Sequence, residues 1–262
     1  MYAFDYRRPG TLNEADLALK AAPEAKLLAG GQTLIPTMKL RLAQPGNIVD
    51  LGGVAQLRGI AKIDGALRIG AMTTHATVAE SADVHAAIPG LAALAAGIGD
   101  PHVRHRGTIG GSVANNDPAA DYPAGVLALG ATVHTTKRSI AADDFFTGLF
   151  STALDDNEII THFDIPVPTS FAYAKFANPA SRFALVGVGV ARTKGGVRVA
   201  VTGAGASGVY RLTDAETALA SSFSASSVGS LKIDPSNLIS DIHAAADYRA
   251  HLVGVMLRRA VG

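Results

Sequence analysis

Cysteine is absent from the 262 residues of this chain. Its absence excludes disulfide bonds, thiolate zinc sites, a cysteine nucleophile, a thioether link to a cofactor and any iron–sulfur cluster held by the chain itself. A dominant charge is also lacking, because 23 Lys and Arg balance 22 Asp and Glu to a formal net charge of +1. The sequence therefore has no electrostatic footprint for nucleic acid or for an anionic membrane surface.

Long apolar runs are missing as well. No stretch approaches the roughly 18 consecutive apolar residues of a membrane-spanning helix, and the start, MYAFDYRRPG, lacks the basic-then-apolar order of a signal peptide. Hydrophobic residues make up 48% of the chain and charged residues 17%, which is typical of a globular protein. We expect a cytoplasmic protein without a membrane span, with one large domain or two to three small ones.

Strand and helix patterns alternate over residues 4–50, which favours a small α/β unit. Its first helix begins with a capping box, because Thr11 precedes Glu14 by three positions. The apolar side of this helix is predicted to consist of Leu12, Leu17 and Leu19.

The following region, 59–177, mixes both patterns, with Asp64-Gly65 as the two-residue turn of a hairpin. A smaller unit of strands and helices comes after it. The sequence predicts an α+β fold with units at 1–56, 57–176 and 177–262.

The stretch LLAGGQTLIPTMK, residues 27–39, runs from an apolar strand through two glycines into a helix. A strand that stops at Gly30-Gly31 and continues as a helix leaves the N–H groups of residues 31–35 unpaired, and glycine permits positive φ and close approach of a ligand. Pro36 fits the first helical turn, where its missing donor costs nothing. Residues 31–35 would form an anion-binding nest. The plain alternative is an ordinary strand-to-helix turn.

A second glycine pair lies in RGTIGGSVANNDPAADYP, residues 106–123. Thr108 and Ser112 flank it, and Asp117 and Asp121 follow. Two glycine turns with hydroxyl neighbours suit a ligand with a pyrophosphate and a long polyhydroxylated body, whose hydroxyls the carboxylates would bind. The alternative is a glycine-rich loop with Asp residues that cap the next helix. Capping explains one of the two acids.

A third glycine cluster, GAGASG at 203–208, matches the G-x-G-x-x-G pattern of dinucleotide-binding proteins. That fingerprint must open directly into a helix and be followed by an acidic residue about 20 positions on. Here VYRLTD intervenes before any helix, and no second strand carries such an acid. The segment is therefore predicted to be a turn.

Histidines and basic residues gather in HVRHRG, where His102 and His105 lie beside Arg104 and Arg106. A metal site would need more ligands and would suffer from the two cations, so a solvated basic loop is favoured. His75, in MTTHAT, would serve as a base or as a covalent anchor for a cofactor, but a polar helix start capped by a preceding threonine explains it better.

Lys175 is a lone cation in the apolar strand pattern AYAKF. An interior lysine needs a partner, which a ligand oxygen would supply. The other interpretation is that the side chain reaches the surface from an edge strand.

Four stretches, taken in order, carry a family resemblance: AGGQTLIPTMKLRLAQPGNIVDLG, LRIGAMTTHATV, DPHVRHRGTIGGSVANNDPAADYPA and FFTG. Together they resemble the FAD-binding medium subunit of the molybdenum hydroxylases, a family that includes carbon monoxide dehydrogenase and xanthine dehydrogenase. A-G-G-[QH]-[ST]-L followed at this separation by T-I-G-G-[SDN] is far more specific than either glycine pair alone. The resemblance covers nearly the whole chain.

This resemblance implies an FAD-binding fold of the vanillyl-alcohol oxidase (PCMH) type at 1–176, followed by a small α+β domain at 177–262. FAD is expected to bind without a covalent link. Backbone amides at Ala29, Gly30, Gly31, Gln32, Thr33 and Leu34 would hold its pyrophosphate. The rest of the cofactor would contact Thr108, Gly110, Gly111, Ser112 and Asp121, with Ile98 beside the isoalloxazine and Ile160 and Lys175 reaching it from later in the domain.

The resemblance also implies the role of the chain. A molybdopterin large subunit would oxidise the substrate, an iron–sulfur small subunit would carry the electrons, and FAD on this chain would pass them to an external acceptor. The relatives form dimers of heterotrimers, and this chain needs no catalytic residue and no metal of its own. The absence of cysteine argues against the branch that reduces hydroxybenzoyl-CoA, whose flavin subunit holds an extra cluster.

Two other functions remain open from the sequence. A self-contained FAD oxidoreductase of the same fold would need a base, for which His75 and His102 are the candidates. A nucleotide-binding module without redox chemistry would use the same glycine turns.

Overall fold

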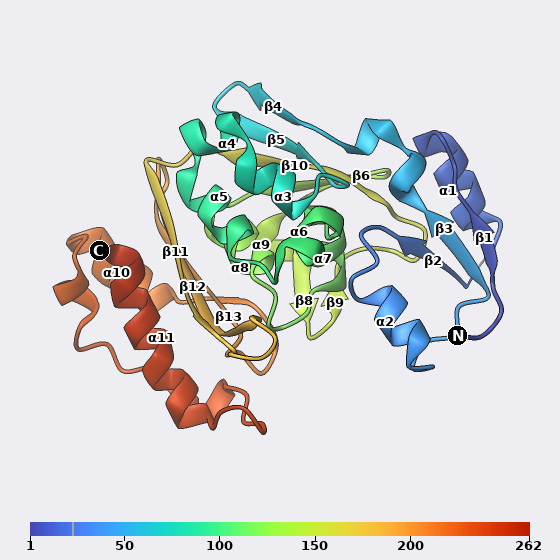
Figure 1. Ribbon diagram of the computed structural model, residues 1–262. Coiled ribbons are helices and arrows are strands. Elements are labelled where there is room, and N and C mark those ends of the chain that lie inside the picture. The colour runs from blue at the N-terminus through green and yellow to red at the C-terminus, as the bar shows by residue number, and fades with distance from the viewer. Residues whose placement is uncertain (23) are drawn as a thin grey trace.

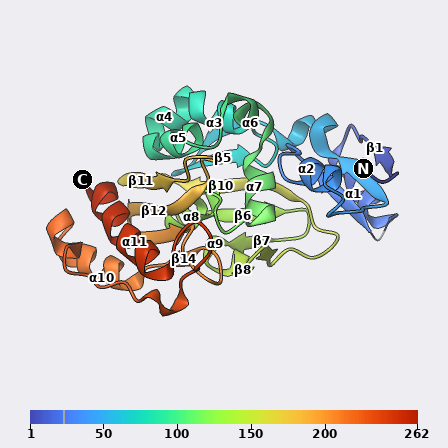
Figure 2. The ribbon, with the colours of Figure 1, turned by 60° about the horizontal axis from the view of Figure 1, so that its bottom comes forward.

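The computed structural model describes residues 1–22 and 24–262. The three larger β-sheets follow one another along the molecule, and the N-terminal sheet lies at the end opposite α10 and α11 in both views (Figures 1 and 2). Among the described residues, every helix is too short or too polar to cross a membrane.

The N-terminal unit is a parallel three-stranded sheet in the order β1-β3-β2, formed by Asp5–Arg7, Asn47–Asp50 and Ala25–Leu28. Helices α1 (Leu12–Lys20) and α2 (Leu34–Lys39) connect the strands. The predicted capping box is present, with Glu14 N–H donating to Thr11 Oγ1. Leu19 is buried as predicted, but the prediction for Leu17 is wrong, because its side chain is 58% exposed.

The central unit is an antiparallel five-stranded sheet in the order β4-β5-β10-β6-β7. Its strands are Ile60–Ile63, Ala66–Gly70, Ile160–Pro166, Thr132–Thr135 and Ser139–Ala141. The predicted hairpin is confirmed, since Asp64 and Gly65 join β4 to β5 and Gly65 has φ +66°. A small hairpin, β8 (Phe146–Gly148) with β9 (Ser151–Thr152), lies nearby.

Helices cover one face of the central sheet, as Figure 2 shows for α3 to α6. Leu67, Ile69, Phe163 and Ile165 form the main core with apolar residues of these helices. The helices are α3 His75–Glu80, α4 Ala82–Ala87, α5 Pro89–Ala96, α6 Pro101–Arg106, α7 Ile109–Asn115, α8 Tyr122–Ala128 and α9 Ala142–Phe145. Short 3₁₀ turns lie at Leu51–Gly53, Ala55–Leu57, Ala225–Val228 and Pro235–Asn237.

The segment HVRHRG is helical, so the prediction of a basic loop is wrong. Asp100 caps α6 by accepting from the N–H of Val103, and Pro101 occupies the first turn. An acidic cap followed by proline is a helix-start signal, which the neighbouring cations obscured in the sequence.

The C-terminal unit is an antiparallel sheet, β11-β12-β13-β14, formed by Ser170–Ala177, Ala184–Thr193, Gly196–Thr202 and Tyr210–Arg211. Helices α10 (Thr213–Ser221) and α11 (Ala246–Val261) pack on one face, and α5 and α8 of the central unit pack on the other. Because β11 pairs with β12 over its whole length, this sheet begins at Ser170. The predicted boundary at 176/177 falls inside β11.

Arg249 of α11 links three segments of the C-terminal unit by hydrogen bonds. Its side chain is buried, and Nη1 donates to the carbonyl oxygens of Leu185 at 2.7 Å and Gly203 at 2.6 Å. Nη2 donates to Asp241 Oδ2 at 2.7 Å. One guanidinium thus donates to the start of β12, to the turn after β13 and to the loop before α11.

Replacing Arg249 with Met should lower the free energy of unfolding of the C-terminal unit by about 3 kcal/mol, because two buried carbonyls and Asp241 lose their donor. Arg259→Met on the same helix is the matched control, since Arg259 is exposed, and should change stability by less than about 0.5 kcal/mol. Urea unfolding followed by circular dichroism measures both. Equal midpoints for the two variants would contradict the assigned role of Arg249.

Candidate functional site

The two glycine turns pack directly against each other. A Cβ added at Gly30 would overlap the carbonyl oxygen of Arg106 and lie 2.7 Å from the Cα of Gly107. A Cβ added at Gly111 would lie 3.2 Å from the Cβ of Ala29. Glycine is therefore required at position 30 for close approach of another backbone segment rather than of a ligand. This contact joins the N-terminal unit to the central unit beside one cavity.

The first turn has the conformation predicted for an anion site. Gly31 has φ +73°, a region that favours glycine. Within the described part of the chain, no acceptor is present for the backbone N–H groups of Gly31, Gln32, Thr33 and Leu34. Ile35 does not belong to this set, because its N–H donates to Gly31 O at 3.3 Å. The predicted nest thus extends over residues 31–34 and not to 35.

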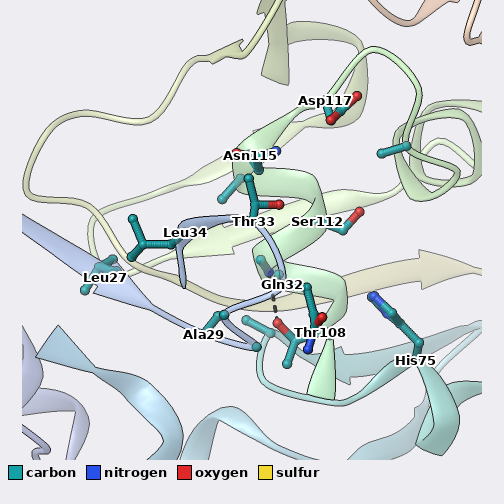
Figure 3. Close-up of a pocket in the computed structure, with 18 of the residues that line it drawn as sticks. Leu27, Ala29, Gln32, Thr33, Leu34, His75, Thr108, Ser112, Asn115 and Asp117 are labelled. Carbon is teal, nitrogen blue, oxygen red and sulfur yellow. Dashed lines mark hydrogen bonds between the residues drawn. The ribbon is translucent and has the colours of Figure 1, made fainter. Parts of the chain in front are cut away.

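The second turn uses its backbone differently. Thr108 caps α7, accepting from the N–H of Gly111 at 3.1 Å, and the N–H of Gly110 donates to Ala71 O at 2.8 Å. Gly111 is helical and, unlike Gly31, does not have positive φ. This turn offers side chains instead: Thr108, Ser112 and Asn115 recur at helical spacing and line the same cavity as the first turn (Figure 3).

Both turns line one cavity of about 750 Å³, a size typical of cofactor sites. All but one of the predicted cofactor residues lie on its wall: Ala29, Gly30, Gly31, Gln32, Thr33, Leu34, Ile98, Thr108, Gly110, Gly111, Ser112, Asp121 and Ile160. The exception is Lys175, which lies behind the wall.

Lys175 has partners that neither interpretation of the sequence anticipated. Its Nζ donates to Asp121 Oδ2 at 3.1 Å and to the carbonyl oxygens of Gly97 at 2.8 Å and Arg182 at 3.1 Å. The side chain is only 11% exposed, so it does not reach the surface. Its three donors are used within the protein, and it acts on the cavity through Asp121.

Asp121 is the buried acid at the centre of this network. Its carboxylate also accepts from Tyr173 Oη at 2.5 Å. Burial raises the pKa of the Asp121 carboxyl, and the Lys175 ammonium and the Tyr173 hydroxyl oppose that rise. The network joins the start of α8 to β11 and to the segment that holds Arg182.

Asp117 forms a turn rather than a helix cap, and because Asp121 makes no capping bond either, the prediction that one of the two acids caps α8 is wrong. Oδ1 of Asp117 accepts from the N–H of Ala119 at 2.8 Å, which closes a turn before α8. Asp121 makes no capping hydrogen bond although it occupies the N-cap position of that helix. Burial raises the pKa of Asp117, and its side chain also faces the cavity.

His75 begins α3 after the capping residue Thr74, as predicted, but it also lines the cavity (Figure 3). Burial, aided by the charge of Arg104, lowers its pKa to about 4, so the imidazole is neutral near pH 7. Its Nδ1 is buried and has no hydrogen-bond partner among the described residues. An orphaned buried nitrogen on a cavity wall is available to a ligand.

Three further charged residues on the wall were missed from the sequence: Lys26 of β2, Glu158 and Arg182. Glu158 is fully buried, and although burial opposes its ionisation, hydrogen bonds from Arg138, Thr135 and the Asp155 N–H lower its pKa to about 2. Arg182 has φ +62° and lies opposite Gly99. Glu158 and Arg182 come from irregular segments without a motif, so no local pattern marked them.

The third glycine cluster is a turn, as predicted, and it lies between β13 and β14 away from the cavity. Gly205 is tightly packed, because an added Cβ would overlap the carbonyl oxygen of Gly208 and lie 2.7 Å from the ring of Tyr210. His102 and His105 are exposed on α6 and belong to no cluster of metal-ligating residues in the described chain.

Comparison with known proteins identifies the family of this chain. Residues 2–168 match the model of the family described as the FAD binding domain in molybdopterin dehydrogenase. The nicotine 6-hydroxylase medium subunit of Paenarthrobacter nicotinovorans is 37% identical over 99% of this chain and 96% of its own length. The carbon monoxide dehydrogenase medium chain of Hydrogenophaga pseudoflava is 34% identical over 98% of this chain and 96% of its own length.

Solved structures show the same fold. A chain of carbon monoxide dehydrogenase from Hydrogenophaga pseudoflava superposes with a TM-score of 0.89 at 33% identity, covering 99% of this chain and 96% of that one. A chain of the carbon monoxide dehydrogenase from Oligotropha carboxidovorans superposes with a TM-score of 0.90 at 33% identity, covering 100% of this chain and 98% of that one. The α+β FAD-binding fold with a C-terminal α+β unit is therefore shared over full length. This chain belongs to the FAD-binding medium subunits of the molybdopterin dehydrogenase family.

Proposed function

We propose that this chain binds FAD without a covalent link and passes electrons from iron–sulfur clusters of a partner subunit to an external acceptor. The observation that carries the proposal is the cavity that four residues with unpaired amides in the first turn line together with the hydroxyls of the second. When bound, FAD supplies the redox chemistry, and the protein supplies placement and electrostatics.

Different residues of the cavity would contact different parts of the cofactor. The amides of residues 31–34, at the positive end of α2, would hold the pyrophosphate. Thr108 and Ser112 offer hydroxyls to its polar body. Ile98 and Ile160 offer apolar surface suited to the isoalloxazine.

The proposed reaction needs no general acid or base on this chain. His75 is the only histidine on the cavity wall in the described residues. It is neutral at pH 7 and accepts a proton only near pH 4, too far below neutrality for an efficient base. The self-contained oxidoreductase considered above therefore has a weak candidate base, and the absence of cysteine leaves no thioether anchor.

We infer partners of two kinds, an iron–sulfur small subunit and a molybdopterin large subunit, assembled as a dimer of heterotrimers. Among the relatives, medium subunits and structures bear names as different as nicotine 6-hydroxylase, carbon monoxide dehydrogenase and quinoline 2-oxidoreductase. Flavin subunits of one fold thus occur with very different substrates. Substrate choice is accordingly assigned to the large subunit.

A tagged copy of the chain, purified anaerobically from its host, should contain FAD, iron and molybdenum, whereas a copy produced alone should contain FAD only. The flavin absorbance should bleach on addition of nicotine, quinoline or carbon monoxide only in the complex, because the isolated chain has no substrate site. Isolation from the host without iron or molybdenum, or bleaching of the isolated chain at the full rate, would favour the self-contained oxidoreductase. A colourless chain that takes up no FAD would favour the nucleotide-binding module.

Gly31→Val should lower FAD affinity by about tenfold or more, because a β-branched residue is forced out of the left-handed region and shifts the amides of the nest. Gly111→Val should weaken binding too, since its added Cβ would lie 3.0 Å from Thr108 Oγ1. FAD released by acid precipitation and a flavin-fluorescence titration measure the loss.

Gly46→Val is the matched control, because an added Cβ there contacts nothing within 4 Å and its φ is not positive. Gly205→Val is unsuitable, since its tight packing would unfold the C-terminal unit. Loss of FAD from Gly46→Val equal to that from Gly31→Val, with folding retained, would show that the nest is misplaced.

Lys175→Met should destabilise the protein by about 3 kcal/mol and reduce FAD affinity, because Asp121 is left as a buried carboxylate without its cation. The double variant Lys175→Met/Asp121→Asn should recover part of the loss, since residues in one network are not additive. Chemical unfolding and FAD titration report the two effects. If Lys175→Met has the same stability and FAD affinity as the wild type, or if the double variant recovers neither, Lys175 does not belong to the site.

A further inference from the structure

The outer face of the central sheet carries two imidazoles and a carboxylate that the flavin site does not use. Along β10, Phe163 and Ile165 are fully buried beneath the helices, so His162 and Asp164 point to the opposite face. His134 on β6 pairs with His162 in the strand register. The three side chains are between 20% and 26% exposed, and their ligand atoms all lie within 4.8 Å of one another.

His162 presents a free lone pair to this group. Its Nδ1 lies 2.9 Å from Thr161 Oγ1, and that hydroxyl donates to the carbonyl oxygen of His134 at 3.1 Å. The hydroxyl oxygen therefore accepts the proton of Nδ1, which leaves Nε2 unprotonated. Nε2 is buried, lies 4.0 Å from Asp164 Oδ1 and has no hydrogen-bond partner among the described residues.

His134 is oriented in the same way. Its Nδ1 lies 2.8 Å from Ser139 Oγ, and its Nε2 lies 3.0 Å from Asp164 Oδ2. The two rings are stacked, with centroids 4.3 Å apart and planes at 9°. Each imidazole thus has a hydroxyl behind Nδ1 and turns Nε2 toward the carboxylate. Metal-bound histidines are held in this manner, with one nitrogen on the ion and the other hydrogen-bonded.

We propose that His134 Nε2, His162 Nε2 and the Asp164 carboxylate bind one divalent transition-metal ion of the zinc type. Two imidazoles and one carboxylate suit Zn²⁺ or Co²⁺ rather than Mg²⁺ or Ca²⁺, and water would complete the tetrahedron. On binding, the single N–H proton of the neutral His134 ring moves from Nε2 to Nδ1, so that Nε2 offers its lone pair to the ion and Nδ1–H donates to Ser139 Oγ. A modest rotation of the stacked rings brings both nitrogens onto the ion.

The Arg68 side chain is expected to weaken metal binding at this site. Its Nε and Nη2 each lie 2.8 Å from one oxygen of Asp164, which orients the carboxylate but places a cation beside the metal. Removing this guanidinium should therefore strengthen metal binding. If the cluster had only a structural role, the same change would simply break the ion pair between Arg68 and Asp164. The metal would cross-link β6 and β10 two residues from Ile160 on the cavity wall.

The test is zinc binding by the full-length, FAD-loaded chain after removal of metals by chelator. Calorimetry should give one saturable site for Zn²⁺ and none for Mg²⁺. Co²⁺ should give the visible absorption bands of a tetrahedral ion. His134→Ala, His162→Ala and Asp164→Asn should each weaken Zn²⁺ binding by at least about tenfold. Arg68→Met should tighten it.

His85→Ala is the matched control, because His85 is an exposed histidine on α4 outside the cluster, and it should bind Zn²⁺ like the wild type. Zn²⁺ should also raise the thermal midpoint of the wild type and the control, but not of the three ligand variants. Equal Zn²⁺ binding by all variants, no binding by the wild type, or weaker binding by Arg68→Met would each overturn the proposal. None of these outcomes depends on the electron-transfer role of the FAD.

Discussion

The contact of Gly30 with the backbone of Arg106 and Gly107 is the constraint on which the proposed flavin site depends. It lets the first glycine turn lie against the second without an intervening side chain. Any larger residue at position 30 would force the N-terminal unit away from the end of α6. The separation of the turns decides whether the free amides of one and the hydroxyls of the other face the same cavity, so this backbone approach fixes the geometry of the whole site.

The two turns look alike in sequence but contribute different chemistry. In the first, positive φ at Gly31 leaves amides without acceptors. In the second, the amides are used by Thr108 and Ala71, and hydroxyls face the cavity instead. Behind the wall, Lys175 and Tyr173 hold the buried carboxylate of Asp121. A desolvated carboxylate needs such partners. Through these hydrogen bonds, β11 of the C-terminal sheet is joined to the start of α8 next to the cavity.

Much of the fold followed from local sequence signals. The capping box at Thr11, the hairpin turn at Asp64-Gly65 and the helix after Gly31 were all predicted, because each depends on contacts within a few residues. Two of the differences from prediction come from long-range packing, whereas the helix Pro101–Arg106 was missed although its start signal is local. Leu17 lies on the exposed side of α1, and β11 joins the C-terminal sheet because of its pairing with β12, which no local pattern encodes.

The sequence alone determined the family, the absence of a cysteine-held cluster and the residues of the two glycine turns, because motif order and residue type are properties of the chain. Only the tertiary structure decided how these residues act. It gave Lys175 a protein partner, Asp121, in place of a ligand, and it separated Asp117 as a turn former from Asp121. It also brought His134 beside His162 and Asp164. Hydrogen bonds between residues more than 25 positions apart depend on sheet register, which the sequence pattern leaves undetermined.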